Sequence, residues 1–239
     1  MRPNNITVKR NVHKTCAILL PACLTLLFCL TVCGADDASD LQALDRPILR
    51  FLPRPPKDDT NINSLIIRAQ TNEAKAECLL GLYYIHGLNV TQDYTNGLKW
   101  LSKSADQGFP PAEYALGILF KSGLGVPTNR PTADRWFQKA SDQGYVPAEH
   151  EAALIADRNG NRDEALKLLR DAAQKGFPSS QYLMGCIASD PVEQCFWYTL
   201  SAENVELSGK HLLEVSRTLT KEQFAEVAER VRNFHSAQK

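Results

Sequence analysis

Residues 76–109 read AECLLGLYYIHGLNVTQDYTNGLKWLSKSADQGF, and residues 112–145 read AEYALGILFKSGLGVPTNRPTADRWFQKASDQGY. The two stretches align without a gap at an offset of 36 residues, and Ala-Glu recurs at position 148 after another 36. Self-similarity at such a period is typical of stacked supersecondary units. We therefore expect an all-α solenoid of stacked antiparallel helix pairs, a fold whose usual function is to present a long surface to a partner.

Each unit is expected to contain two helices joined by a turn. In unit one the helices cover about 76–86 and 94–106, and unit two repeats this arrangement. Gly108 and Gly144 follow the second helices, where a left-handed residue commonly ends a helix. Gly81 and Gly117 fall inside the first helices, so we expect a neighbouring helix to approach closely there. By the same recurrence, Trp100 and Trp136 are expected to fill the space between units.

The repeat also sets the domain limits. Unit three has Ala153 in place of the glycine, whereas unit four restores Gly185 and Trp197, and both have shortened turns. A C-terminal helix follows, with a capping box of Thr220 and Gln223 and with Phe224, Val227 and Val231 on one face. The expected solenoid is 60–204, with a half-unit at 60–75, units at about 76–111, 112–147, 148–179 and 180–204, and capping helices at 205–239.

The N-terminus has the pattern of a targeting segment. A basic stretch ending at Lys14 precedes 17 apolar residues, then Gly34, Ala35 and a polar sequence. This pattern is typical of a secretory signal within residues 1–35, with an uncleaved anchor or lipidation at Cys33 as alternatives. We expect an exported protein, periplasmic or secreted, or one anchored by this segment with its body outside the cytoplasm. Residues 36–59 are proline-rich, and we expect them to form an extended tether.

The charge pattern gives no reason to expect nucleic acid as a partner. Formal net charge is zero, but residues 36–239 contain 23 basic and 27 acidic side chains and no basic stripe. The body contains three cysteines, Cys78, Cys186 and Cys195. Because Cys186 and Cys195 flank one short turn, a disulfide between them and two unpaired thiols are equally open alternatives.

The repeat resembles the Sel1-like repeat, a relative of the tetratricopeptide repeat. The resemblance covers about residues 64–204, and unit one departs from it with Asn89 for a turn glycine and Gly97 for an alanine. It implies a right-handed α-solenoid that acts as a scaffold or regulatory adaptor, binding another protein or a cell-envelope component. The positions of unit two that carry it are Ala112, Leu116, Gly117, Phe120, Gly123, Gly125, Val126, Ala133, Trp136, Ala140 and Gly144.

No catalytic, cofactor-binding or metal-binding motif is recognisable. His86 and His150 lie on first helices with no HExxH pattern, and the cysteine spacing lacks the C-x-x-C of a structural zinc site. We therefore expect no enzyme activity and no cofactor. The alternative is a cysteine-rich envelope hydrolase or β-lactam-binding enzyme, which some exported relatives suggest. Those relatives have paired cysteines in essentially every repeat, whereas here only unit four has two.

A protein-binding surface is expected on the first helices, which line the inner surface of helical solenoids. Membrane contact is expected only through the N-terminal segment. Positions that the repeat leaves free to vary are the candidates for specificity. They are Tyr83, His86, Leu119, Ser122, Glu151, Ile155 and Arg158.

Overall fold

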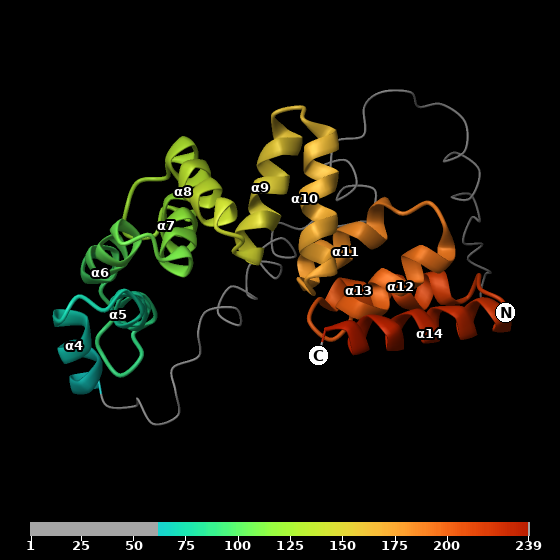
Figure 1. The fold of residues 1–239 in the computed structure, drawn as a ribbon, viewed down its shortest axis with the longest axis horizontal. Coiled ribbons are helices and arrows are strands. Elements are labelled where there is room, and N and C mark those ends of the chain that lie inside the picture. The colour runs from blue at the N-terminus through green and yellow to red at the C-terminus, as the bar shows by residue number, and fades with distance from the viewer. Residues whose placement is uncertain (1–61, 239) are drawn as a thin grey trace, which may run out of the picture.

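The computed structural model describes residues 62–238, which form eleven helices and no strand. From α4 to α12 the helices follow one another in chain order along the long axis of the molecule (Figure 1). The expected targeting segment and tether, 1–35 and 36–59, lie outside the described residues. The helices are α4 (Ile62–Gln70), α5 (Ala74–His86), α6 (Tyr94–Asp106), α7 (Pro110–Ser122), α8 (Arg130–Asp142), α9 (Val146–Arg158), α10 (Arg162–Gln174), α11 (Pro178–Ile187), α12 (Pro191–Ser201), α13 (Glu206–Ser216) and α14 (Lys221–Ala237).

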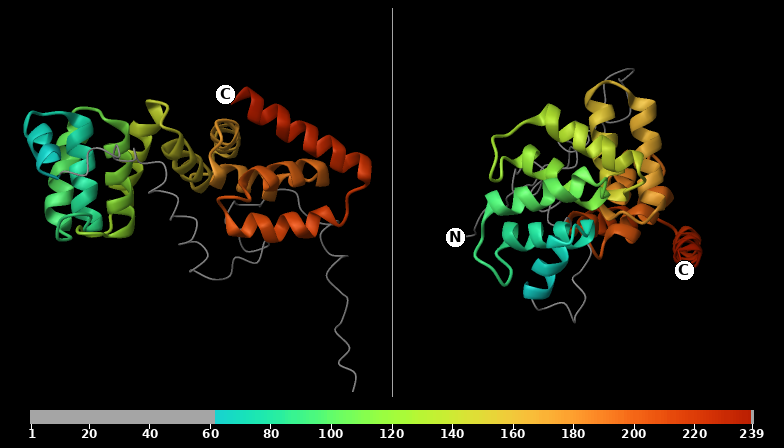
Figure 2. Two further views of the ribbon diagram at one scale, coloured as in Figure 1. Left: turned by 90° about the horizontal axis from the view of Figure 1, so that it is seen from below. Right: turned by 60° about the vertical axis from the view of Figure 1, so that its left-hand side comes forward.

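The helices pair as the repeat predicts, α5 with α6, α7 with α8, α9 with α10 and α11 with α12, and α4 packs on α5 as the half-unit. Figure 2 shows these pairs from two further sides. Gly108 and Gly144 have the predicted positive φ, at 75° and 76°. Asn72, which stands where Gly108 stands, shares this conformation with φ 66°. The turn chemistry predicted from the sequence is therefore confirmed at these positions.

The glycines inside the first helices are confirmed as points of close approach. A Cβ at Gly81 would lie 2.7 Å from Cγ of Leu101, and one at Gly117 would lie 2.5 Å from the Phe137 ring. Gly185 of unit four meets the Tyr198 ring in the same way, at 2.6 Å. Each glycine therefore receives one large side chain from the second helix of its own unit.

The two repeated tryptophans pack between units, as expected. Trp100 contacts the cluster that α4 and α5 form, and Trp136 contacts the cluster of α5, α6 and α7. In both, a lysine one turn later covers the ring, with Lys103 and Lys139 Nζ each 4.4 Å from the ring centroid. Each tryptophan is half-buried, so it closes the edge of a core instead of filling its centre.

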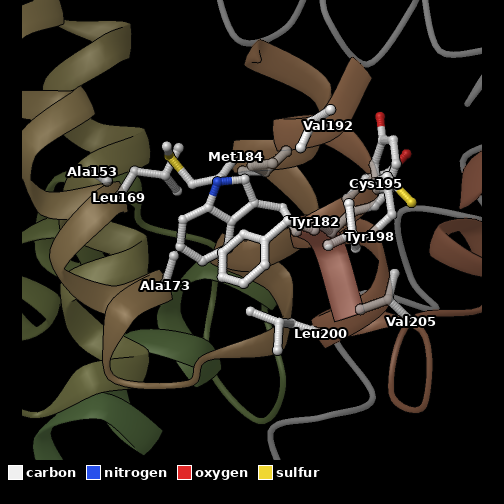
Figure 3. Packing of buried hydrophobic residues seen from close by; sticks show 14 residues of the cluster. Ala153, Leu169, Ala173, Tyr182, Met184, Val192, Cys195, Tyr198, Leu200 and Val205 are labelled. Atoms are coloured by element: carbon white, nitrogen blue, oxygen red, sulfur yellow. The ribbon is translucent and has the colours of Figure 1, made fainter. Parts of the chain in front are cut away.

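The C-terminal end of the stack contains the largest apolar cluster. Tyr182, Met184, Cys195 and Tyr198 from α11 and α12 lie here with Leu169 of α10 (Figure 3). Aromatic rings from several helices pack at this end, and those with ring contacts are Tyr182, Phe196, Trp197, Tyr198, His211 and Phe234.

Helices α13 and α14 both pack against α12 and cover this end of the stack. The capping box of Thr220 and Gln223 is present. Phe224, on the same face of α14 as Val227 and Val231, is 43% exposed. Val227 and Val231 do face the core, and Phe234 joins them, with its ring 6.0 Å from that of Phe196. Phe224 lies in the first turn of α14, and the core contacts of the helix begin one turn later.

Helix α9 differs from the other first helices in what it buries. Its buried apolar side chains are small: Pro147, Ala148, Ala152, Ala153 and Ala156. Three ion pairs tie it to its neighbours instead. Their charged atoms are Lys121 Nζ and Glu151 Oε1 at 3.0 Å, Arg158 Nη2 and Asp134 Oδ2 at 2.7 Å, and Lys175 Nζ and Glu149 Oε1 at 2.5 Å. Polar contacts therefore hold α9 where larger apolar side chains hold α5 and α7.

The glutamate of each Ala-Glu pair is buried, a feature that sequence reasoning missed. The side chain at Glu77 is 0% exposed and that at Glu113 is 3% exposed. Each accepts a hydrogen bond from a glutamine 30 residues later, Gln107 at 2.5 Å and Gln143 at 2.6 Å. The glutamine directly precedes the left-handed glycine that ends the second helix, so this contact joins the two helices of one unit.

Burial makes the charged form of these carboxyl groups costly. Desolvation raises the pKa of Glu77, and the charge of Lys103 and the Gln107 hydrogen bond oppose this only in part. Desolvation likewise raises the pKa of Glu113. Glu73, in contrast, has a lowered pKa because Arg68 bonds its carboxylate, with Nη2 to Oε1 at 2.6 Å.

Replacing Gly117 with alanine should destabilise the protein. The added methyl group meets the Phe137 ring in a packed core, which typically costs about 1–3 kcal/mol. This exceeds the roughly 0.5–1 kcal/mol that alanine gains over glycine inside a helix. Urea unfolding of Gly117→Ala measures the difference.

Gly209→Ala is the matched control, because Gly209 lies within α13 and a Cβ there meets nothing within 4 Å. This variant should be more stable than the wild type. Equal effects of the two substitutions would contradict the close-approach explanation.

The raised pKa of Glu77 predicts a pH-dependent contribution to stability. The folded state binds the proton of the Glu77 carboxyl group more tightly than the unfolded chain does. The stabilisation that results is fully present below the ordinary pKa of 4.5, and it is lost as pH rises through the folded-state pKa. Glu77→Gln removes this loss. The free energy of unfolding of the variant, relative to wild type, should therefore increase from about pH 4 to about pH 7.5.

Glu73→Gln supplies a control of opposite sign. Because the pKa of Glu73 is lowered, its contribution is present above the ordinary pKa and is lost as pH falls. The stability of this variant relative to wild type should decrease over the same pH rise. Parallel pH curves for the two variants would contradict both assignments.

Candidate protein-binding surface

The structure divides the seven predicted surface residues into two groups. Tyr83, Leu119 and Glu151 are buried, with exposed fractions of 6%, 3% and 6%, so placing them on a binding surface was wrong. Ile155 is half-buried and packs against an apolar cluster of units two and three. The three exposed residues are His86, Ser122 and Arg158, which all end a first helix.

These positions are buried because a first helix has neighbours on several sides. Helix α7 contacts its own partner α8 and also α6 of the preceding unit. All residues of α7 from Ala112 to Gly117 are buried as a result. Glu151 is buried for a further reason: its carboxylate is paired with Lys121 of α7, at 3.0 and 3.2 Å.

Aromatic side chains at two repeat positions form a stripe across successive units. One position is the residue before each first helix, and the other is the fifth residue of that helix. Tyr114 contacts Tyr145, which directly precedes α9, with ring centroids 5.4 Å apart, and His150 contacts Phe177, which directly precedes α11, at 5.1 Å. We define the aromatic stripe as Phe109, Tyr114, Tyr145, His150, Phe177 and Tyr182.

The stripe is aromatic along its length but does not present every ring equally. Tyr114, Phe177 and Tyr182 are buried, whereas Phe109, Tyr145 and His150 are half-buried. Unit four continues the pattern, because Tyr182 stacks on His211 of α13 with ring centroids 5.8 Å apart. Rings with one face packed and an edge accessible provide rigid contact area at low conformational cost.

Burial controls the electrostatics of the stripe. Desolvation lowers the pKa of His150 to about 3, with the Lys121 charge acting in the same direction. Desolvation also raises the pKa of the Tyr145 hydroxyl above its ordinary value. Both side chains are therefore neutral at physiological pH, and the stripe is a neutral surface with polar groups at its ring edges.

His150 and Ser180 form a hydrogen-bonded pair, with Nδ1 to Oγ at 2.8 Å. A histidine beside a serine hydroxyl can activate the serine as a nucleophile when a substrate reaches it. Here Ser180 is 0% exposed, at the packed interface of units three and four. It occupies the repeat position at which the earlier units have the alanine of the Ala-Glu pair. The pair as placed links α9 to α11 and offers no approach to the hydroxyl oxygen.

The three cysteines of the described residues form no disulfide with one another. Cys186 and Cys195 are therefore two thiols in the structure, and not a disulfide. Tyr198 donates a hydrogen bond from its hydroxyl to Cys186 Sγ at 3.6 Å, while Cys195 lies buried in the core of α12. Burial raises the pKa of Cys78 to about 12, so this thiol is neutral and unreactive.

Over residues 62–238, no three histidine, cysteine or acidic side chains lie close enough together to hold a metal ion. Within the same residues, no helix combines the length and apolarity needed to cross a bilayer.

The aromatic stripe could have been predicted from the sequence, whereas the ion pairs of α9 could not. Phe109, Tyr145 and Phe177 each follow the glycine that ends a second helix, which is a visible recurrence of aromatic residues. The ion pairs of α9 join residues 24 to 30 positions apart. Glu149 recurs as Glu77 and Glu113, but units one and two have a glutamine where unit three has Lys175. Only the folded chain shows that they meet.

Comparison with known proteins identifies this fold. The family model described as Sel1 repeat matches residues 74–109, 110–145 and 156–177. No curated protein matches the chain in sequence. Among solved structures, a Sel1 repeat protein from Oxalobacter formigenes is similar with a TM-score of 0.57 and 26% identity, over 73% of this chain and 74% of that one.

A second solved structure is similar in fold. It is c5321, a protective antigen of uropathogenic Escherichia coli strains that displays an SLR fold. The TM-score is 0.51 and the identity 18%, over 87% of this chain and 55% of that one. The matched repeats coincide with the helix pairs α5–α6 and α7–α8 and with most of the third pair. The chain therefore contains segments that match the Sel1 repeat, and its helical stack is similar to that of Sel1 repeat proteins.

Proposed function

We propose that this protein is an exported scaffold or regulatory adaptor that binds another protein along the aromatic stripe. Sel1 repeats form helical stacks that mediate protein binding, and the stripe is the surface where this chain concentrates rigid contact groups. The observation that carries the proposal is the recurrence of one ring contact in two units, Tyr114 with Tyr145 in unit two and His150 with Phe177 in unit three. Aromatic side chains are the residue type most enriched at binding hot spots.

A binding role is favoured over a catalytic one. The serine–histidine pair of units three and four is closed by packing, since Ser180 is fully buried. The charge pattern agrees with a protein partner, because residues 62–238 contain 18 basic and 21 acidic side chains without a basic stripe.

The proposed place of action follows from the N-terminal sequence. Residues 1–35 have the order of basic, apolar and small residues that secretory signals have. Export should therefore yield a chain that begins near residue 36, which mass spectrometry of the protein purified from cells would detect. A mass equal to the full sequence in the cytosolic fraction would contradict export, and a membrane-bound full-length chain would indicate an anchor.

Photo-crosslinking tests the proposed surface directly. A photo-reactive phenylalanine analogue at Phe109, beside the half-buried rings, should capture a defined set of proteins in cells. The same analogue at Lys167, an exposed position on the second helix α10, is the matched control and should not capture them. Equal capture at both positions would show that the stripe is not the site.

Replacing the two half-buried polar rings should abolish specific capture. Tyr145→Leu with His150→Leu keeps apolar packing but removes both polar ring edges, and hot-spot losses of this kind are on the order of 2 kcal/mol, or roughly thirtyfold in affinity. Glu164→Ala with Lys167→Ala, both exposed on α10, should have no effect. Thermal unfolding of each variant verifies that the helices are intact. Undiminished capture by the folded stripe variant would overturn the proposal.

A further inference from the structure

The chain contains two Asn-Gly pairs, and the fold holds them in different ways. One is Asn96–Gly97, inside α6, and the other is Asn159–Gly160, in the turn between α9 and α10. An asparagine followed by glycine can lose its side-chain amide without an enzyme. The reason is that glycine has no Cβ to obstruct attack by its own backbone nitrogen, and its backbone adopts many conformations.

The reaction at such a pair needs only water. At the second pair, the backbone nitrogen of Gly160 loses its proton and attacks Cγ of Asn159. A bond forms between these two atoms, the bond from Cγ to Nδ2 breaks, and the leaving nitrogen takes up a proton and departs as ammonia. Water then opens the cyclic imide. Opening at Cγ yields aspartate, whereas opening at the backbone carbonyl carbon yields isoaspartate, whose main chain runs through the former side chain.

The first pair is held in a conformation that opposes this attack. The backbone nitrogen of Gly97 donates a hydrogen bond to Asp93 O at 2.9 Å, and Asn96 Nδ2 donates one to Asp93 Oδ2 at 2.7 Å. Gly97 is also buried against α5, where an added Cβ would lie 2.5 Å from Cδ1 of Ile85. Rotation of the backbone between Asn96 and Gly97 therefore requires the first turn of α6 to unfold away from α5.

The second pair lies in open space at a helix end. Asn159 is the residue that caps the C-terminus of α9, and both Asn159 and Gly160 are exposed. A Cβ at Gly160 would meet nothing within 4 Å. The backbone nitrogen of Gly160 donates to Asp157 O at 2.9 Å, within the same exposed turn. Hydrogen bonds at exposed helix ends open at low cost in free energy, so the nitrogen becomes available for attack far more often than that of Gly97.

We propose that Asn159 is a deamidation site, at which the folded protein converts over time to aspartate and isoaspartate while Asn96 is protected. The product carries a negative charge that asparagine lacks. This charge lies next to Arg158, whose Nη2 is 2.7 Å from Asp134 Oδ2 of α8. Deamidation therefore adds a carboxylate beside the ion pair that joins α9 to α8. Because the reaction requires only water, the site is independent of the partner binding proposed above.

Incubation of the purified protein in mildly alkaline buffer tests the site. Peptide mapping by mass spectrometry detects the conversion of an amide to a carboxyl group at each asparagine, and an isoaspartyl methyltransferase labels the isoaspartate. In the folded protein Asn159 should react at least about tenfold faster than Asn96, the ratio produced by a difference of about 1.4 kcal/mol in the free energy of backbone opening. In urea, where the fold protects neither pair, the two should react at comparable rates.

Two variants assign the signal within the turn. Asn159→Gln keeps a side-chain amide but lengthens the side chain, so the imide ring that would form is larger, and the signal at this position should be lost. Asn161→Gln is the matched control, because Asn161 is exposed in the same turn but is followed by Arg162 instead of glycine. It should leave the rate at Asn159 unchanged.

Three results would overturn the proposal. The first is an equal rate at Asn159 and Asn96 in the folded protein. The second is a signal in this turn that survives Asn159→Gln. The third is a folded protein that reacts at neither residue during a period in which the unfolded chain reacts at both.

Discussion

The close approach of the two helices within a unit is the constraint on which the rest of the structure depends. At Gly81, Gly117 and Gly185 the first helix has no side chain, and Leu101, Phe137 or Tyr198 occupies the space. Unit three satisfies the same geometry differently, with Ala153 and Leu169 packed in one cluster. Once this distance is fixed, the second helix must end where its glutamine reaches the buried glutamate, as Gln107 reaches Glu77 and Gln143 reaches Glu113.

The regular part of this fold was predictable because the same physical requirement recurs in several units. Glycines at left-handed positions and the capping box of Thr220 are local signals, and the structure has them where expected. Phe224 shares the apolar face of α14 but is exposed. The packing of α14 on α12 begins one turn later, at Val227.

The candidate surface was less predictable, for a reason that lies in solenoid geometry. Variable positions such as Tyr83 and Leu119 look like free surface in a single unit, but the neighbouring unit covers them. Glu77, Glu113 and Glu151 were misleading in a second way, because glutamate is ordinarily exposed and its burial here depends on partners far along the chain. Aromatic recurrence is the better signal, since it marks the two positions whose rings meet in units two and three.

The small side chains of α9 have a consequence for how the protein unfolds. The buried apolar side chains of α9 are small, with Ala148 in the cluster of Tyr114 and Phe137 and Ala153 in the cluster of Tyr182 and Trp197. Three ion pairs add to these contacts, and salt weakens ion pairs while leaving apolar burial intact. We therefore expect high ionic strength to weaken the attachment of α9 to its neighbours more than it weakens the two apolar clusters.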